Sequence, residues 1–328
     1  RQQMGLNYPL IVRYLRWIGF WLDVNGELNG MLQGNFGYSQ IYKTDVANVL
    51  PSRMLNTIYI NIFSTLVALA ITIPLGIYCA VLAFVFGAVF GSFLNCAAWR
   101  IAHGESFLHG RSHCTVCGHI LSAPDLVPIF SWLFLGGKCR YCKAKISARY
   151  MLAELFFAVV SVASLLRWDL SVEYLRNMVF ACCLFCLSLV DLESFEIPNG
   201  CLIISAAAWL AALPFTGMEK MAILAHLLTG VGYGAIMLGL TLLFDKILGK
   251  ETMGGGDIKL FAVTGLYLGA AASLFSLFFS CILGLLMGAV RNRNQKGAPI
   301  PFGPSIALAS YVMLLYGERL VNWYLGLL

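Results

Sequence analysis

The stretch MGGGDIKL at residues 253–260 places three glycines and one aspartate at the head of a long apolar run. Glycine has no Cβ, so it lets backbone approach a neighbouring group closely and adopts positive φ without a clash. A carboxylate at the edge of a hydrocarbon layer is costly, and its usual reason for being there is function. Asp257 is therefore a candidate functional residue. Asp191, which follows another apolar run, is its candidate partner.

The composition predicts a membrane protein. The 328 residues are 59% hydrophobic and only 12% charged, and the mean hydropathy is +0.79. Several uncharged runs approach the roughly 20 residues that a helix needs to cross a bilayer. Runs of this length suit helices and not the alternating strands of a barrel. We expect an all-α polytopic membrane protein, and the net charge of +6 is no evidence for a nucleic-acid partner.

The order of apolar and charged segments predicts about eight core transmembrane helices. The expected spans lie at about 82–98, 150–166, 176–190, 200–216, 222–244, 258–270, 272–290 and 303–323, and an extra hydrophobic helix is possible at 56–78. Lys and Arg concentrate in the loops 100–149, 245–257 and 291–296. These loops alternate with shorter ones, and the positive-inside rule assigns their set, which also contains 191–199, to the cytosol. Asp191 and Asp257 then lie at the same depth, at the cytosolic face. The predicted parts are a segment 1–80, a first core helix 81–99, a loop 100–149 and a transmembrane protease core 150–328.

Two carboxylates at one membrane depth suit acid–base catalysis. Close carboxylates cannot easily both be ionised, so they share a proton. The ionised member can take a proton from water while the protonated member hydrogen-bonds a scissile carbonyl. The alternative is that each aspartate only caps a helix, with Asp257 as an N-cap and Asp191 as the mark of a helix end. For either residue alone the two interpretations are equally good, whereas the pair beside a triple glycine favours catalysis.

Four of the 11 cysteines are regularly spaced in the polar loop 100–149. Cys114 and Cys117 form one CxxC pair, and Cys139 and Cys142 form the second. Two such pairs predict a tetrahedral zinc site with four thiolate ligands, which leaves no open position and is therefore structural. Two disulfides or four free thiols are the alternatives, and a cytosolic loop disfavours the disulfides. We expect the nearby His113 and His119 to lie in solvent.

From about residue 82 to 328 the chain resembles the type IV prepilin peptidases, which are membrane aspartic proteases with a GxGD motif. The matching features are Gly87, GSFLN at 91–95, the four loop cysteines, PIFSWL at 128–133, ISARY at 146–150, Asp191 with IPN at 197–199, residues 254–260, and PFGP at 301–304. The resemblance implies that Asp191 and Asp257 are the catalytic pair. It also implies a protein of the bacterial inner membrane that cleaves the basic leader of prepilin-like precursors in the lipid bilayer at the cytosolic face, for type IV pili or type II secretion.

The four-cysteine loop belongs, within that family, to bifunctional members that also methylate the new amino terminus. The resemblance therefore implies S-adenosylmethionine as methyl donor, and Gly91 matches a glycine linked to methylation. Gly87 and Gly91 also have the four-residue spacing of small residues that pack helices together. Both interpretations of Gly91 stay open.

Residues 1–80 resemble the amino-terminal part of oligopeptide ABC-transporter permeases, through GLNYPL at 5–10, YLRW at 14–17, GNFGYS at 34–39 and IPLG at 73–76. We interpret this segment as a fused or truncated remnant. It supports one rival function, a permease-type transport subunit or scaffold. Other rivals are a presenilin-like GxGD protease acting within the bilayer, and a methyltransferase with an inactive protease site.

Other charged residues have simple expected roles. Glu193 and Glu196 are expected to be solvated loop charges, and Lys259 is expected to reach toward lipid headgroups. Arg149 and Glu154 could form an interfacial pair. The tract RNRNQK at 291–296 is expected to contact anionic lipid.

Overall fold

The computed structural model describes residues 8–22, 26–39, 41–106, 110–249, 252–294 and 301–327, without the side chains of residues 52 and 291–294. The basic tract 291–296 and the start of the GLNYPL motif thus lie outside what can be described. The chain divides into two compact units, Arg1–Tyr78 and Cys79–Leu328.

The first unit is small and contains little regular structure before its long helix. Helix α1 (Leu10–Ile18) is followed by a 3-10 turn η1 (Met31–Gln33) and by a short antiparallel hairpin of β1 (Tyr38–Ser39) and β2 (Thr44–Asp45). The amide group of Gln33 donates a hydrogen bond to the carbonyl of Gly19. This bond ties η1 to the end of α1.

Helix α2 (Val46–Ala102) runs through both apolar stretches that the sequence analysis separated, 56–78 and 82–98. Between them stand Tyr78, Cys79, Ala80 and Val81, with no glycine, no proline and no polar cluster. These four residues include no type that usually ends a helix, so the helical hydrogen bonding of α2 continues from one apolar stretch into the next.

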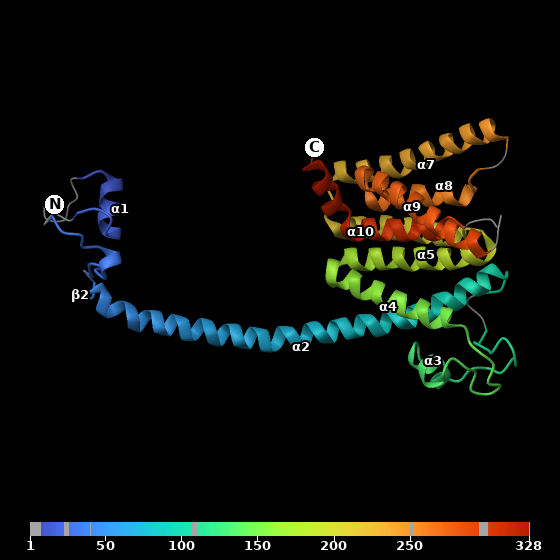
Figure 1. Cartoon of the computed structure of the whole chain (residues 1–328), viewed down its shortest axis with the longest axis horizontal. Helices are drawn as coiled ribbons and strands as arrows, with labels where there is room; N and C mark the ends of the chain where they lie inside the picture. The colour runs from blue at the N-terminus through green and yellow to red at the C-terminus, as the bar shows by residue number, and fades with distance from the viewer. Residues whose placement is uncertain are drawn as a thin grey trace. The chain divides into compact units, whose positions relative to one another are not determined.

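The second unit is a helical bundle with one long polar connection, residues 103–147 between α2 and α4, which we call the cysteine-rich segment (Figure 1). Its elements are η2 (Ala123–Asp125), α3 (Phe130–Phe134), α4 (Ala148–Trp168), α5 (Val172–Ser194), α6 (Asn199–Thr216), α7 (Lys220–Leu248), α8 (Gly255–Leu268), α9 (Ala270–Asn294) and α10 (Gly303–Leu325). Helix α5 packs against α4, α6 and α10, and α8 packs against α6, α7 and α10. Phe157, Phe180, Leu260 and Ile306 are fully buried between them.

The helical class is confirmed, whereas the number of spans is not settled. Among the described residues, six helices are long and apolar enough to cross a membrane: α2, α4, α5, α6, α7 and the Ala270–Val290 part of α9. Helix α8 has 14 residues, so it is roughly 21 Å long against a hydrocarbon layer of about 30 Å. The expectation of eight core spans stays a prediction.

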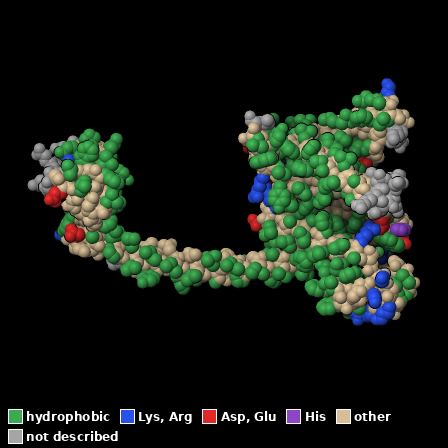
Figure 2. Space-filling view, viewed as in Figure 1, with side chains coloured by type: hydrophobic (Ala, Val, Ile, Leu, Met, Phe, Trp, Pro, Cys, Tyr) green, Lys and Arg blue, Asp and Glu red, His purple; other side chains and the backbone are tan. Residues whose placement is uncertain are grey.

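Hydrophobic side chains cover the flank of the bundle, and Lys and Arg side chains gather on the cysteine-rich segment (Figure 2). Large apolar residues such as Leu210, Phe215 and Phe278 are more than half exposed. A water-soluble protein rarely exposes so continuous an apolar surface. The distribution fits helices that face lipid and a polar segment that lies outside it.

Candidate active site

Asp191 lies near the end of α5 with only 5% of its surface exposed. Its Oδ2 atom accepts a hydrogen bond of 2.8 Å from the backbone N–H of Gly303, the first residue of α10. A Cβ on Gly303 would lie 2.7 Å from that same oxygen, so a larger residue cannot keep this contact. The positive end of the α10 dipole therefore faces a carboxylate from a different helix.

Asp257 lies in the first turn of α8 and is partly buried. The N-cap position of α8 is occupied by Gly254, without a capping hydrogen bond from a side chain. Asp257 is therefore not the N-cap of this helix, whereas Asp191 lies in the last turn of α5, which ends at Ser194. The turn that contains Asp257 lies against the loop that follows Asp191, through Gly256 and Ile197.

The triple glycine brings the loop after Asp191 against the start of α8. A Cβ on Gly256 would lie 2.9 Å from the Cβ of Ile197, so the missing side chain allows this approach. One turn away, the Lys259 ammonium donates a hydrogen bond of 3.0 Å to the side-chain oxygen of Asn199. Lys259 thus joins α8 to α6, in addition to any contact with headgroups. The IPN and GGGD motifs form one unit around the two aspartates.

Glu193 is not the solvated loop charge that the sequence suggested. Its Oε1 atom forms an ion pair of 2.8 Å with Arg149, and its side chain is 21% exposed. Its Oε2 atom is buried without a hydrogen-bond partner among the described residues. The expected pair of Arg149 with Glu154 is not formed either, because Glu154 instead accepts the backbone N–H of Ile129 at 2.6 Å. These partners lie far apart in the sequence, and only the packing of α4 on α5 selects them.

The four loop cysteines lie together, with all their sulfur atoms within 4.8 Å of one another. None forms a disulfide, and the Cys114 and Cys142 sulfurs are 3.8 Å apart. Zn–S bonds of about 2.3 Å in a tetrahedron place sulfurs about 3.8 Å apart, so the geometry fits a zinc ion. Backbone N–H groups of Cys117 and Val116 lower the pKa of the Cys114 thiol to about 6, which favours the thiolate that binds a metal.

Each cysteine pair closes in a tight backbone turn. Cys114 and Cys139 donate their N–H groups to the carbonyls of His119 and Ala144, and the residue after each second cysteine has a left-handed backbone. That residue is Gly118 in the first turn and Lys143 in the second, at φ values of 69° and 61°. The two turns are thus near copies of one another.

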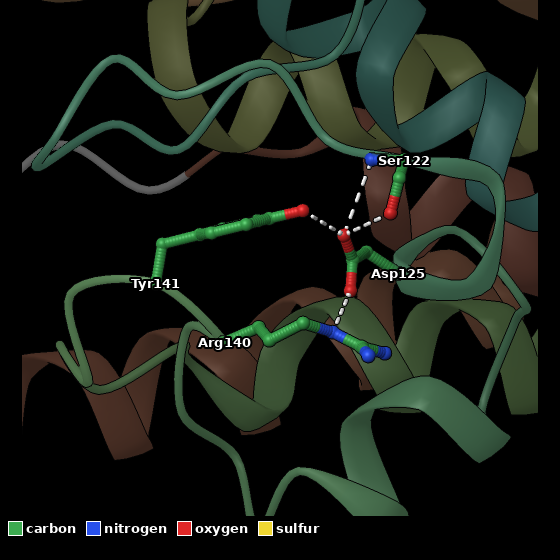
Figure 3. Close-up of polar contacts among 4 residues, drawn as sticks. All are labelled: Ser122, Asp125, Arg140 and Tyr141. Carbon is green, nitrogen blue, oxygen red and sulfur yellow. Dashed lines mark hydrogen bonds and ion pairs between the residues drawn. The ribbon is translucent and has the colours of Figure 1, made fainter.

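Asp125 joins the second cysteine turn to Ser122, which follows the first turn (Figure 3). Its carboxylate accepts hydrogen bonds from the N–H and hydroxyl of Ser122, forms an ion pair of 2.6 Å with Arg140, and accepts the hydroxyl proton of Tyr141. The Ser122 hydroxyl and the Arg140 guanidinium lower the pKa of Asp125 to about 2. The Tyr141 ring also lies against the ring of His119, with ring centroids 3.7 Å apart. His119 is nevertheless exposed, as is His113, which agrees with the expectation that both lie in solvent.

Comparisons with known proteins agree with this geometry. A family model for the bacterial peptidase A24 N-terminal domain matches residues 85–168, and one for the type IV leader peptidase family matches residues 178–289. A prepilin leader peptidase/N-methyltransferase of Bacillus subtilis is 35% identical over 248 residues, which cover 74% of this chain and 96% of that protein. The chain belongs to the prepilin leader peptidase family. No solved structure matches it.

Two further prepilin leader peptidase/N-methyltransferases support the same assignment. That of Aeromonas hydrophila is 33% identical and covers 74% of this chain and 93% of its own length. That of Dichelobacter nodosus is 33% identical, and the match covers 75% of this chain and 94% of that protein. Residues 1–84 lie outside both family models, so their resemblance to a permease stays a prediction.

Gly87 and Gly91 lie against α4. A Cβ on Gly87 would be 2.6 Å from the Cβ of Ser161, and one on Gly91 would be 3.0 Å from the Cβ of Phe157 and 3.1 Å from the Cα of Glu154. These contacts support the interpretation that small residues allow close packing of α2 on α4. They also place Gly91 in contact with the backbone of Glu154.

Sequence reasoning missed Gly303 as a partner of Asp191 and missed Arg149 as a partner of Glu193. It also missed Asp125 as the link between Ser122 and the second cysteine turn. The motif PFGP carried a signal for the first, because a glycine between two prolines at a helix start suggests a close backbone approach. The other two had no local signal in the sequence.

Proposed function

We propose that Asp191 and Asp257 are the catalytic pair with which this chain cleaves the basic leader from prepilin-like precursors. The observation that carries the proposal is the contact between the segments that hold the two aspartates, at the ends of α5 and α8, in the bundle of a prepilin leader peptidase. Motifs far apart in the sequence converge there, since Ile197 packs on Gly256 and Asp191 binds Gly303.

The reaction follows from two carboxylates that hold one proton between them. The ionised carboxylate takes a proton from a water molecule, whose oxygen attacks the scissile carbonyl carbon while the protonated carboxyl donates a hydrogen bond to the carbonyl oxygen. A tetrahedral intermediate forms, and its collapse breaks the C–N bond as a proton passes to the leaving nitrogen. The products are a free carboxylate on the leader and a new amino terminus. No covalent enzyme intermediate is needed.

The same chain methylates the new amino terminus, as its family does, and S-adenosylmethionine would supply the methyl group when bound. We assign Gly91 a positioning role in this second reaction, through its contact with Glu154. Zinc held by Cys114, Cys117, Cys139 and Cys142 would be structural, because four thiolates fill its coordination shell. It would hold together a segment whose core is too small to fold without a metal.

The protein is placed in the bacterial inner membrane with the cysteine-rich segment and both aspartates at the cytosolic face. Figure 1 supports this, because the α5–α6 and α7–α8 connections lie at the same end of the bundle as the cysteine-rich segment. That segment is rich in Lys and Arg, which favours the cytosol. The basic leader of a precursor would reach the aspartates from that side, with its apolar helix in the bilayer.

Substitution of either aspartate tests the proposal. In purified protein reconstituted into lipid vesicles, Asp191→Asn and Asp257→Asn should each reduce cleavage of a prepilin by about 100-fold or more, because each removes a group that transfers a proton. Cleavage is followed by the mass of the precursor. The matched control is Asp169→Asn, the same change at an exposed position in the α4–α5 connection. Folded aspartate variants that cleave at the control rate would disprove the assignment.

A further inference from the structure

An apolar groove of about 230 Å³ lies between α4, α5 and α10. Helix α5 lies between the other two helices (Figure 1) and packs against both. The residues of α5 that line the groove recur every three or four positions and therefore share one face of that helix. They include Ala181, Leu184, Ser188 and Leu192. The lining residues of α10 have the same spacing and include Pro304, Leu308 and Tyr311. The face of α5 is thus the floor of the groove, and α4 and α10 are its walls.

The lining of the groove is almost entirely hydrocarbon. Among the described residues, no charged side chain lines it. The hydroxyl of Ser188 donates a hydrogen bond of 2.6 Å to a carbonyl of its own helix, so this polar group already has a partner. The rings of Phe156 and Phe185 stack with centroids 5.8 Å apart and add aromatic surface. A ligand in this groove is therefore held by apolar contact.

Hydrogen bonds across the groove close one of its ends. The Tyr311 hydroxyl of α10 donates to the carbonyl of Val160 at 2.8 Å and lies 2.9 Å from the hydroxyl of Ser164. Both partners belong to α4, so the two walls meet at this point. A chain that occupies the groove must therefore enter from the other end.

That other end lies at the proteolytic site. Leu192 and Pro304 line the groove, and they directly follow Asp191 and Gly303, which are joined by the 2.8 Å hydrogen bond. A helix rises about 1.5 Å per residue, so the floor of the groove from residue 181 to residue 192 is roughly 16 Å long. The groove thus extends from the Asp191 carboxylate along α5 into the apolar part of the bundle.

The substrate of the proposed reaction has a segment that suits this groove. Its apolar helix begins after the basic leader, so the chain beyond the aspartates needs apolar surroundings within a few residues. A helix with its side chains is about 10–12 Å across, so the groove takes only the side chains of one helix face, at positions such as i, i+3, i+4 and i+7. A phospholipid would also need a partner for its headgroup, and Arg149 at this end is already paired with Glu193.

We propose that this groove holds the first turns of the apolar helix of the precursor and thereby sets the cleavage site at Asp191. The inference rests on the proposed leader cleavage and adds the place where the rest of the substrate is held. Phe156 and Leu308 are positioning residues in this arrangement, because they line the walls and contact the helix at a distance from the reacting bond.

Photochemical cross-linking in the full-length protein, reconstituted into lipid vesicles, tests the location. The photoreactive residue p-benzoylphenylalanine replaces Leu308, which is exposed at the groove, and Asp257→Asn in the same chain keeps the precursor intact. Irradiation with a prepilin should join this position to the residues that follow the cleavage site. The matched control carries the photoreactive residue in place of Leu210, which is exposed on α6 and outside the lining. It should join lipid alone.

Steady-state kinetics test whether the groove contributes to binding. Phe156→Ala removes an exposed ring from the groove wall and should raise KM for a prepilin about tenfold with little change in kcat, because the lost contact is present in both the ground state and the transition state. Phe278→Ala makes the same change at an exposed position of α9 outside the lining. It should leave KM as in the unchanged protein.

Two results would overturn the inference. One is a cross-link from the Leu308 position to lipid alone or to the leader, and the other is the same KM for both phenylalanine variants. Leader cleavage by the unchanged protein continues in either case, so the proposed function would stand without the groove. The cross-link forms whether or not the precursor is cleaved, so the groove is tested even if the aspartates prove not to be catalytic.

Discussion

At the scale of single residues, the site depends on places where a side chain is absent. Gly303 and Gly256 each allow an atom of another segment to come within 3 Å of where a Cβ would be. The first approach brings a backbone N–H to the Asp191 carboxylate, and the second brings the loop of Ile197 onto α8. Both glycines are therefore required by their neighbours and not by their own backbone angles.

Gly303→Ala should inactivate leader cleavage without unfolding the bundle. The added methyl group collides with Asp191 Oδ2, so the carboxylate must move away from the N–H that holds it, and we expect cleavage to fall about 100-fold, as for loss of one preorganised donor. The matched control is Gly317→Ala on the same helix, where the new methyl meets only the flexible end of Met313 and the Cβ of Ala272, at 3.2 and 3.3 Å. The cleavage rates of both variants are measured at a temperature at which melting curves show both to be folded. Equal cleavage by the two variants would contradict the role of Gly303.

At the scale of elements, two contacts shape the region to which we assign the proposed methylation. Helix α2 lies on α4 through Gly87 and Gly91, and within the cysteine-rich segment Asp125 holds the second cysteine turn to Ser122. The pKa of about 2 keeps Asp125 ionised at every pH at which thiolates bind zinc. Acid loss of the metal should therefore reflect protonation of the cysteines, while the Asp125 link stays charged.

The variants Gly91→Ala and Gly87→Ala distinguish a role of Gly91 in packing α2 on α4 from a role in positioning Glu154 for methylation. Both add a methyl group between α2 and α4, and the clash is tighter at Gly87, with a contact of 2.6 Å against 3.0 Å at Gly91. Overpacking of this kind typically costs about 1–3 kcal/mol. We expect Gly91→Ala to lower methylation of the cleaved pilin more than Gly87→Ala does, although it is the less destabilised variant. If loss of methylation instead follows loss of thermal stability, Gly91 acts through packing alone.

At the scale of the whole molecule, the loops between helices divide into two groups, one at each end of the helical bundle. One end carries the cysteine-rich segment, the aspartates and the Arg149–Glu193 pair. The opposite end carries the pair of Arg167 with Glu318, from the ends of α4 and α10, at 3.0 Å. Each end thus carries one ion pair between helices, and the pair at the opposite end is exposed.

Labelling of engineered cysteines tests which end faces the cytosol. In intact cells with a permeable outer envelope, a membrane-impermeant maleimide should label Asp169→Cys, in the α4–α5 connection. It should label Glu196→Cys, in the α5–α6 connection, only after the inner membrane is broken. The unsubstituted chain gives the background of its native cysteines. If Glu196→Cys is labelled in intact cells and Asp169→Cys only after the membrane is broken, the proposed topology is inverted. The aspartates would then lie on the side of the membrane away from the cytosol.

The sequence by itself determined the membrane class, the cysteine quartet and the pair of aspartates, because hydropathy, metal-ligand spacing and a glycine-flanked acidic residue are all local patterns. It did not reveal that α2 is continuous, that Gly303 holds Asp191, or that Arg149 pairs with Glu193 and not with Glu154. Those contacts join residues from different helices, and the register in which α4, α5, α8 and α10 pack selects each partner. Only the tertiary structure decides that register, since every helix presents several residues of similar chemistry and packing excludes all but one arrangement.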